Sequence, residues 1–160
     1  IFGEGALRGK MEVLARDLGI SDRVLFTGAR SDTRELLSAF DVLVSPSHSE
    51  GMSNVLLEAM SMACPIVATS VGGNRELLED GVNGVFAPPR NPEALANAMI
   101  SLLSSPDRGS SLGARARLEV QNRFGLDFMV RRYQDLYERK KKDFEHQEKY
   151  DQHGWPRCGN

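Results

Sequence analysis

Short apolar runs alternate with amphipathic segments over most of the chain. The apolar runs predict four β-strands, at residues 23–28, 41–47, 65–70 and 84–88. The remaining segments carry apolar residues at helical spacing and predict helices over residues 7–18, 32–40, 54–62, 74–80, 91–103, about 108–123 and about 127–142. Apolar strands that alternate with helices are typical of the α/β class, in which helices cover both faces of a parallel sheet.

The first residues indicate that the sequence begins inside a strand. Only Ile1 and Phe2 precede a turn at Gly3, whereas a strand usually has about 5 or 6 residues. We therefore expect the chain to be a fragment of a longer protein.

Composition narrows the class of protein. The chain has 160 residues, of which 41% are hydrophobic and 26% charged, and a formal net charge of −2, which suits one globular domain and argues against a dedicated nucleic-acid binder. Cys64 and Cys158 have no metal-binding or redox spacing, so we expect a reducing cytoplasm. No apolar run reaches the roughly 18 to 20 residues of a membrane span, and no signal peptide is visible.

We expect one domain over residues 1–143 and a charged tail over residues 144–160. The end of the chain is mixed in sign and poor in apolar residues, which is typical of a helix end and a solvated tail. Four consecutive basic residues, Arg139 to Lys142, leave a weak peripheral contact with an anionic membrane as the alternative.

In a parallel sheet, ligands bind outside the carboxyl ends of the strands. The stretches to inspect are therefore residues 3–5, 28–31, 45–55 and 70–75. The stretch over residues 45–55 is the most informative. There Glu50 and Gly51 form a turn, and Ser53 is placed to cap the helix that follows. Because the first turn of a helix offers unpaired N–H groups and Gly51 lets a ligand approach the backbone, this loop predicts a diphosphate site.

Two carboxylates flank that predicted site. Glu58 lies about 6 Å beyond Asn54 on the same helix face, which is about the reach from a bound phosphate to the ribose of the same nucleotide. A carboxylate can accept two parallel hydrogen bonds, which suits a ribose diol. Glu50 lies where the far end of the diphosphate, and hence a transferred sugar, would be. Spacing alone leaves other roles open: Glu50 as an ordinary capping loop residue and Glu58 as a residue at the edge of a buried helix.

Two glycine-rich turns are weaker candidates for contacts to a ligand. The segment "GEGALRG" has glycines at 3, 5 and 9, so its third glycine is misplaced for a dinucleotide fingerprint, and we do not expect an NAD enzyme. Gly3 and Gly5 can instead turn the chain beside a cleft. Gly72 and Gly73 end a predicted strand and open a helix, either as a second backbone-amide site or as a tight turn.

Three segments together resemble a known family. They are "FGEGALRGKMEVLARDLGISDRVLFTG", "SPSHSEGMSNVLLEAM" and "PIVATSVGGNRELLEDGVNGVFAPP". They are similar to the C-terminal, donor-binding half of retaining GT-B glycosyltransferases of family 4, also called glycosyl transferases group 1. The resemblance covers about residues 1–140.

This resemblance implies a Rossmann-like domain that, with an N-terminal partner domain, encloses a nucleotide sugar. It implies sugar transfer with retention at the anomeric carbon, without a metal or another cofactor, from a donor such as a UDP- or GDP-sugar. The absence of an Asp-x-Asp pair from the sequence agrees with metal independence. The acceptor expected from the family is a glycan or lipid-linked glycan, at the inner face of the membrane.

The resemblance also assigns roles to matching positions. Glu50 is the catalytic residue of the paired-glutamate motif, near the donor sugar, and Glu58 is expected to bind the ribose. The loop of Gly28, Ala29 and Arg30 corresponds to the resting place of the base. The donor is expected to contact the backbone of Gly51, Met52, Ser53, Asn54 and Val55.

The sequence departs from the family in small ways and lacks larger parts. Many relatives have proline in place of Ser53 and glycine in place of Ala63. The family's basic pair for the diphosphate, the first strand and helix of the domain, and the acceptor domain would all lie upstream of Ile1. We expect the fragment alone to be catalytically inactive, because each lost charge-assisted phosphate contact costs roughly 1.5 to 3 kcal/mol.

Two alternatives remain from the sequence. One is a non-catalytic module that keeps the GT-B fold for binding, against which the intact Glu50 and Glu58 argue. The other is a phosphorylase-type sugar enzyme, which would normally bring a cofactor lysine. No lysine lies in a suitable loop at a strand end of this sequence.

Overall fold

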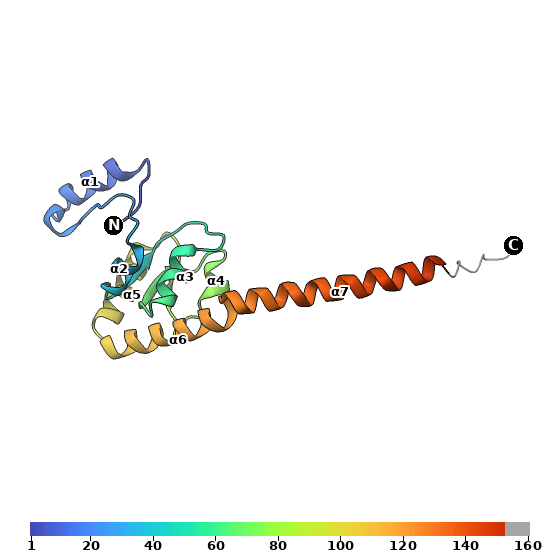
Figure 1. The fold of residues 1–160 in the computed structure, drawn as a ribbon. Helices are drawn as coiled ribbons and strands as arrows, with labels where there is room; N and C mark the ends of the chain where they lie inside the picture. Colours follow the sequence, from blue (N-terminus) through green and yellow to red (C-terminus); the bar gives the residue numbers. More distant parts are fainter. Residues whose placement is uncertain (153–160) are drawn as a thin grey trace. The chain divides into compact units, whose positions relative to one another are not determined.

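The computed structural model describes the backbone of residues 1–152 and the side chains of residues 1–144. By the contacts among its residues, the chain divides into two compact units, Ile1–Phe40 and Asp41–Asn160. In chain order the elements are α1 (Arg8–Asp17), the short 3-10 helix η1 (Ser21–Arg23), α2 (Thr33–Ser38), β1 (Leu43–Ser45), α3 (Asn54–Ser61), β2 (Ile66–Thr69), α4 (Asn74–Leu77), β3 (Val85–Ala87), α5 (Pro92–Leu103), α6 (Pro106–Phe124) and α7 (Leu126–Gln152) (Figure 1).

The strand predicted over residues 23–28 is wrong as a regular strand. This segment is held to the first residues of the chain by three main-chain hydrogen bonds, from Gly3 N to Gly28 O at 2.8 Å, from Thr27 N to Ile1 O at 3.0 Å and from the Ile1 amino group to Leu25 O at 2.7 Å. They leave only an isolated parallel bridge between Phe2 and Gly28. A single bridge does not make a ladder, so this segment is not a regular strand.

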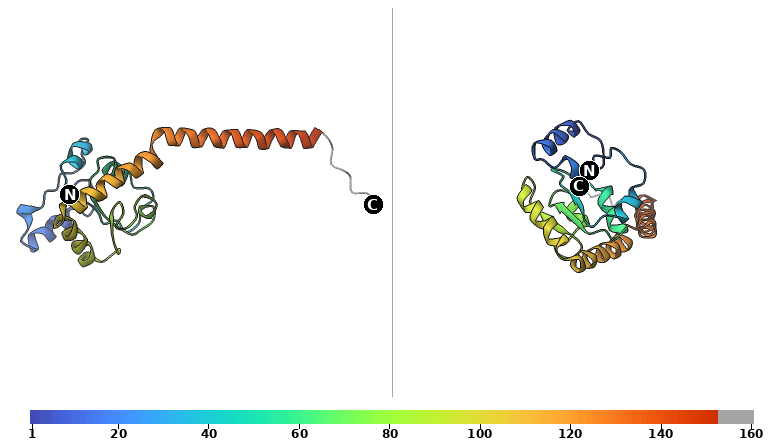
Figure 2. Two further views of the ribbon diagram at one scale, coloured as in Figure 1. Left: turned by 90° about the horizontal axis from the view of Figure 1, so that it is seen from below. Right: turned by 90° about the vertical axis from the view of Figure 1, so that its left-hand side faces the viewer.

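The second unit contains a parallel sheet in the order β1-β2-β3, as the pattern of apolar runs predicts. Successive residues of a strand face opposite sides of a sheet. On one face, Val67 packs with Leu102 of α5 and Leu112 of α6. The right-hand view of Figure 2 shows α3 and α5 on opposite sides of the strands. The sheet is thus covered by helices on both faces.

The packing of α3 and α6 depends on a glycine. A Cβ placed on Gly113 of α6 would overlap the carbonyl oxygen of Ala63 and lie 2.8 Å from its carbonyl carbon. Gly113 and Ala116 are both buried and leave room for this close approach of helix to backbone.

We expect Gly113→Ala to lower the free energy of unfolding by about 1 to 3 kcal/mol, because backbone atoms cannot move aside as a flexible side chain can. Gly109→Ala in the same helix is the matched control: its Cβ would lie 3.4 Å from Cγ of Pro65, an ordinary contact. The control therefore keeps the gain of about 1 kcal/mol that alanine has over glycine in a helix. Chemical denaturation measures both. Equal stability of the two variants would contradict the packing account.

Ala63 follows the end of α3 in a left-handed conformation, with φ of 55°. Glycine adopts this conformation without strain, whereas a residue with a Cβ does not. We expect Ala63→Gly to stabilise the fold by about 1 kcal/mol. The same substitution at Ala114, exposed within α6, is expected to destabilise by about 1 kcal/mol. A loss of stability in both variants, measured by denaturation, would contradict the strain at Ala63.

Several predicted ends of helices and strands are wrong. The helix predicted over residues 74–80 ends at Leu77, because Leu78 is extended and buried. The Asn83 side chain then holds the turn that follows: it accepts a hydrogen bond from Glu79 N at 2.7 Å and donates one to Leu77 O at 3.2 Å. α7 is longer than predicted and continues to Gln152. The helix over residues 32–40 and the strand over 41–47 are also shorter than predicted, at 33–38 and 43–45.

The helix predicted from Asn91 is confirmed with its cap. The Asn91 side chain accepts a hydrogen bond from Ala94 N at 2.9 Å, and Pro92 occupies the first turn. Asp32 occupies the cap position of α2 but does not cap it, because its carboxylate pairs with Arg30 instead.

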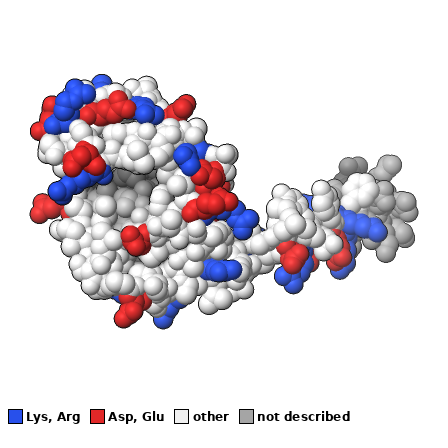
Figure 3. Space-filling view, turned by 60° about the vertical axis from the view of Figure 1, so that its left-hand side comes forward, with Lys and Arg blue, Asp and Glu red and all other residues white. Residues whose placement is uncertain are grey.

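α7 carries the apolar stripe that its sequence predicts. Met129, Tyr133, Leu136 and Tyr137 are all exposed in the described structure. Figure 3 shows most of the visible charged side chains of α7 along one edge, with uncharged residues along the other. In residues 1–152, no helix combines the length and apolar character that a membrane span requires.

Cys64 lies in the core, 3% exposed. Burial, the largest cause, raises the pKa of its thiol, a hydrogen bond with the Leu43 backbone lowers it, and the negative charge of Asp41 raises it. A thiol held protonated in this way is a poor nucleophile and acts here as a packing residue. Cys158 and the end of the expected tail, residues 153–160, lie outside the described residues.

Candidate functional site

The predicted diphosphate loop lies at the carboxyl end of β1, between that strand and α3. The chain leaves β1 at Ser45, turns at Glu50 and Gly51, and enters α3 at Asn54. The segment after β2, residues 70–73, follows the neighbouring strand and leads into α4. The second unit therefore has two consecutive strand-end loops at one edge of its sheet, where α/β proteins bind ligands.

The loop residues differ in exposure in a way that suits a ligand. Glu50 is half-buried, Gly51 is exposed and Met52 is 51% exposed. Ser53 is buried, with its backbone extended at φ −82° and ψ 107°, so it turns the chain into the helix. Gly51 and Met52 are thus accessible from outside, immediately before the first turn of α3.

Ser53 has the cap position that the sequence predicts, but the predicted capping bond is absent. Its side chain makes no hydrogen bond to the first turn of α3. The first N–H groups of a helix have no partner within the helix. At α3 they keep their hydrogen-bonding capacity and the partial positive charge of a helix N-terminus, which together attract anions.

The two carboxylates stand before and after that first turn. Glu58 lies on α3, exposed, one turn beyond Asn54, which is also exposed, while Val55 is half-buried. Among the residues whose side chains are described, none makes a hydrogen bond or ion pair with the carboxylate of Glu50 or of Glu58. Both side chains are therefore free to bind a ligand.

Gly72 and Gly73 lie directly against the Glu50 loop. Gly73 donates a backbone hydrogen bond to Glu50 O at 3.1 Å. A Cβ on Gly73 would overlap the carbonyl oxygen of Gly51 and lie 2.7 Å from its carbonyl carbon. The amide of Gly73 is thus engaged within the protein, in a turn packed against the Glu50 loop.

The remaining predicted residues, Gly3, Gly5, Gly28, Ala29 and Arg30, belong to the first unit. Gly3 and Gly28 both have positive φ, 112° and 72°, and are joined by the hydrogen bond from Gly3 N to Gly28 O. Gly5 accepts a hydrogen bond from Arg8 N at 3.1 Å as the chain enters α1. These glycines form turns, as the sequence predicts.

The loop predicted to hold the base contains Ala29 and Arg30, both exposed. Arg30 donates from Nε to the Asp32 carboxylate at 2.7 Å and makes a second, very short contact to it. The hydrogen bond and the charge of Asp32 raise the pKa of Arg30, and the same hydrogen bond lowers the pKa of Asp32. Arg30 therefore stays charged and is oriented by its neighbour two residues on.

Sequence reasoning missed two residues that shape the site, Thr69 and Asn74. The Thr69 hydroxyl donates to Ser47 O at 2.6 Å, and the Asn74 side chain donates to Thr69 O at 3.0 Å. Both are buried, at 4% and 0% exposure. A polar residue inside the apolar pattern of a strand end was the available signal, since buried polar groups in native proteins are normally bonded.

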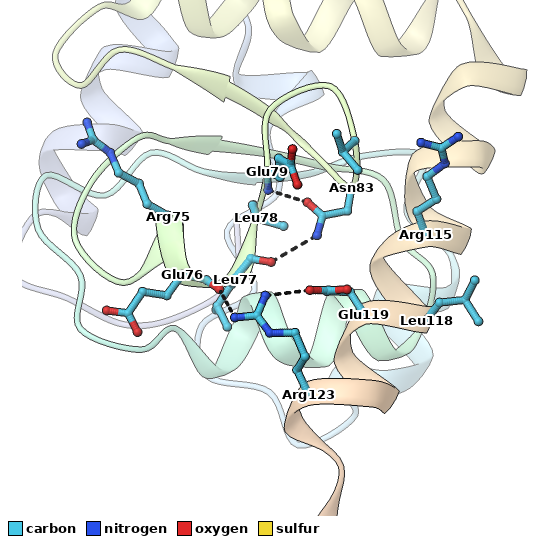
Figure 4. A pocket seen from close by; sticks show the side chains of 11 residues that line it. Arg75, Glu76, Leu77, Leu78, Glu79, Asn83, Arg115, Leu118, Glu119 and Arg123 are labelled. Atoms are coloured by element: carbon cyan, nitrogen blue, oxygen red, sulfur yellow. Dashed lines mark hydrogen bonds and ion pairs between the residues drawn. The ribbon is translucent and has the colours of Figure 1, made fainter. Parts of the chain in front are cut away.

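Two hollows in the second unit are alternative sites. One, of about 600 Å³, lies between α6 and the chain around α4, and within its lining Asn83 and Arg123 make hydrogen bonds (Figure 4). There Arg123 donates to Glu119 at 2.7 Å and to Glu76 O at 3.4 Å. The other, of about 280 Å³, lies beside the Glu50 loop and includes His48, Thr69 and Arg90 in its lining. The second hollow extends the candidate site along the strand ends.

No cluster of three or more histidine, cysteine, aspartate or glutamate side chains suitable for a metal occurs within the described residues.

Comparison with known proteins gives the same fold and a family. Residues 1–105 match the model of the family described as glycosyl transferases group 1. The chain is 32% identical over 136 residues to the lipopolysaccharide core biosynthesis glycosyltransferase LpsE of Rhizobium meliloti, covering 85% of this chain and 40% of LpsE. It is 34% identical over 137 residues to the N-acetyl-alpha-D-glucosaminyl L-malate synthase of Bacillus anthracis, covering 86% of this chain and 36% of that enzyme.

Solved structures of other proteins have the same fold. HepE of Anabaena, crystallised with UDP-glucose, superposes with a TM-score of 0.79 at 26% identity, over 86% of this chain and 39% of HepE. The sucrose-phosphate synthase of Thermosynechococcus elongatus gives a TM-score of 0.79 at 31% identity, over 87% of this chain and 35% of that enzyme. The chain therefore spans well under half the length of these relatives. It belongs to the glycosyl transferases group 1 family and corresponds to part of the C-terminal domain of its GT-B fold.

Proposed function

We propose that the chain forms the donor-binding domain of a retaining, metal-independent glycosyltransferase that uses a nucleotide sugar. One observation supports this most: in a chain of this family, Glu50 and Glu58 stand before and after the open first turn of α3, at the carboxyl end of β1. Within the described residues neither carboxylate has a protein partner.

The diphosphate would bind at the N-terminus of α3. Ser53 leaves the first-turn N–H groups uncapped, and Gly51 has no side chain to hinder an approaching phosphate. These N–H groups stabilise the negative charge that grows on the diphosphate as the bond to the sugar breaks. Fixed dipoles serve this purpose without a metal ion and without proton transfer to the diphosphate.

The ribose would bind at Glu58. This residue lies four positions beyond Asn54, about 6 Å along the helix, and its exposed carboxylate can accept hydrogen bonds from two neighbouring hydroxyls. The base would lie in the loop of Ala29 and Arg30 that follows Gly28. HepE was crystallised with UDP-glucose, which makes UDP-sugars the first donors to test, followed by GDP-sugars.

The transferred sugar would lie at Glu50, on the other side of the diphosphate from Glu58. A half-buried carboxylate there can bind sugar hydroxyls and oppose the positive charge that develops at the anomeric carbon. The backbone of Met52 to Val55 would line the path between the sugar and the diphosphate.

The acceptor would be a glycan or a lipid-linked glycan, reached at the cytoplasmic face of a membrane. The name of the relative LpsE refers to lipopolysaccharide core biosynthesis, which agrees with such an acceptor. The second domain that completes a GT-B enzyme would contribute most of the acceptor site, and Arg139 to Lys142 on α7 would add a weak attraction to anionic lipid.

The test is a transfer assay on the full-length gene product that contains this chain, with UDP- and GDP-sugars, glycan and lipid-linked acceptors, and EDTA. We expect donor-dependent transfer in EDTA, with the anomeric configuration of the donor kept in the product, as NMR reports. Inversion, or loss of activity in EDTA, would contradict the proposed mechanism. Donor binding without turnover would favour a non-catalytic module, and release of a sugar phosphate from a glycan and inorganic phosphate would favour a phosphorylase.

A further inference from the structure

The backbone that carries Glu50 is held from one side by residues 69–74, which we call the support segment. It runs from the last residue of β2 to the first residue of α4 and includes Thr69, Gly72, Gly73 and Asn74. Its contacts reach the start and the middle of the Glu50 loop, although the two segments are more than twenty residues apart in sequence.

The start of the loop is held by the Thr69 hydroxyl. It lies 2.6 Å from Ser47 O and 3.4 Å from Ser45 O, so its proton is directed mainly to Ser47. Thr69 is 4% exposed, and water cannot readily replace this bond. The carbonyl of Ser47 is thereby fixed three residues before Glu50.

The middle of the loop is held by the glycine pair. Gly73 N donates to Glu50 O at 3.1 Å, which fixes the peptide that follows the Glu50 side chain. A Cβ on Gly72 would overlap Glu50 O and lie 3.1 Å from its carbonyl carbon. The two segments approach so closely that the support segment touches the Glu50–Gly51 backbone directly.

The support segment is itself anchored by Asn74. This side chain is 0% exposed and donates to Thr69 O at 3.0 Å, which closes the turn between the end of β2 and α4. Its Oδ1 atom is buried without a hydrogen-bond partner among the described residues. A buried oxygen without a partner lowers the stability of the fold. An amide at this position therefore indicates that the conformation of the turn, which its other hydrogen bond holds, is important.

We propose that Thr69 is a positioning residue for catalysis: through Ser47 O, together with the contact of Gly73 with Glu50 O, it fixes the backbone from which the Glu50 carboxylate reaches the donor sugar. This inference rests on the proposed function. Rate acceleration by a charged group falls steeply when the group is misplaced by about 1 Å, so loosening the loop should slow the chemical step more than it weakens donor binding.

The test compares Thr69→Val and Thr69→Ser in the full-length gene product, with steady-state kinetics for the donor. Valine keeps the shape and removes the hydroxyl, while serine keeps the hydroxyl. We expect Thr69→Val to lower kcat about tenfold, with donor KM changed by less than about threefold, and Thr69→Ser to restore most of kcat. Circular dichroism and Tm confirm that each variant is folded at the assay temperature.

Ser101→Ala is the matched control. It removes a part-buried hydroxyl that donates to Ala98 O at 3.1 Å within α5, and it is expected to leave kcat unchanged. If valine at position 69 prevents folding, Thr69→Ala and Thr69→Ser provide the same comparison, since they differ only in the hydroxyl.

Glu50→Gln, assayed alongside, tests the proposed function separately from the positioning role of Thr69. If Glu50→Gln is fully active, the proposed function fails at its catalytic residue. If Glu50→Gln is inactive while Thr69→Val keeps kcat within twofold of the unmodified protein, the positioning role of Thr69 is wrong. A Thr69→Ser variant as slow as Thr69→Val, or an equal loss in Ser101→Ala, would also overturn it.

Discussion

Replacing Glu50 by glutamine in the full-length gene product is expected to lower kcat by about 10² to 10³, with little change in the donor KM. Glutamine keeps the size of the side chain and its ability to hydrogen-bond sugar hydroxyls, but it removes the negative charge. Charge placed to stabilise a transition state contributes on this scale when one group is lost. An effect on kcat without one on KM marks an interaction that is made mainly in the transition state.

The measurement is steady-state kinetics with the best donor, and Glu76→Gln is the matched control. Glu76 is an exposed glutamate on α4, outside the candidate site, so the same substitution there should leave kcat unchanged. A Glu50→Gln variant with kcat within about threefold of the unmodified protein would remove Glu50 from the mechanism, because a transition-state charge cannot contribute so little.

Replacing Glu58 by alanine is expected to weaken donor binding by about 10²-fold while kcat at saturating donor stays within a few-fold. Two hydrogen bonds from ribose hydroxyls to a carboxylate would be lost, and bonds to charged groups contribute about 1.5 to 3 kcal/mol each before solvent exposure reduces them. Because Glu58 is exposed on α3, its removal should leave the fold intact.

A donor lacking one ribose hydroxyl turns this prediction into a double-mutant cycle. With the unmodified protein, the 2′-deoxy and 3′-deoxy forms of the nucleotide should bind more weakly than the ribonucleotide. With Glu58→Ala, that difference should nearly vanish, because the hydroxyls have lost their acceptor. An equal penalty in both proteins would show that Glu58 does not contact the ribose.

Features that depend on neighbouring residues were predictable from sequence. The cap of α5 at Asn91 follows from a local pairing of asparagine with the proline after it, and the structure confirms it. The three strands of the second unit were predictable because apolar residues occupy most positions in each of them. The strand at residues 23–28 was not, because a strand exists only when another segment pairs along it, and this segment forms only the isolated bridge between Phe2 and Gly28.

The candidate site likewise combines features that the local sequence sets with features that depend on contacts between distant segments. The order of Glu50, Gly51, Ser53 and Glu58 is local, so the loop and its carboxylates could be named from sequence. The missing cap bond at Ser53 could not, since side-chain rotamers respond to packing. The support of the loop by Thr69 and Gly73 joins segments over twenty residues apart, which no local pattern encodes.

The most direct test of the central claim is a crystal structure of the full-length gene product with the nucleoside diphosphate of the donor that it accepts. The account predicts the diphosphate against the backbone N–H groups at the start of α3, a ribose hydroxyl within hydrogen-bonding distance of Glu58, and the terminal phosphate directed toward Glu50. A nucleotide bound elsewhere, or bound with its ribose away from Glu58 and its diphosphate away from α3, would contradict it.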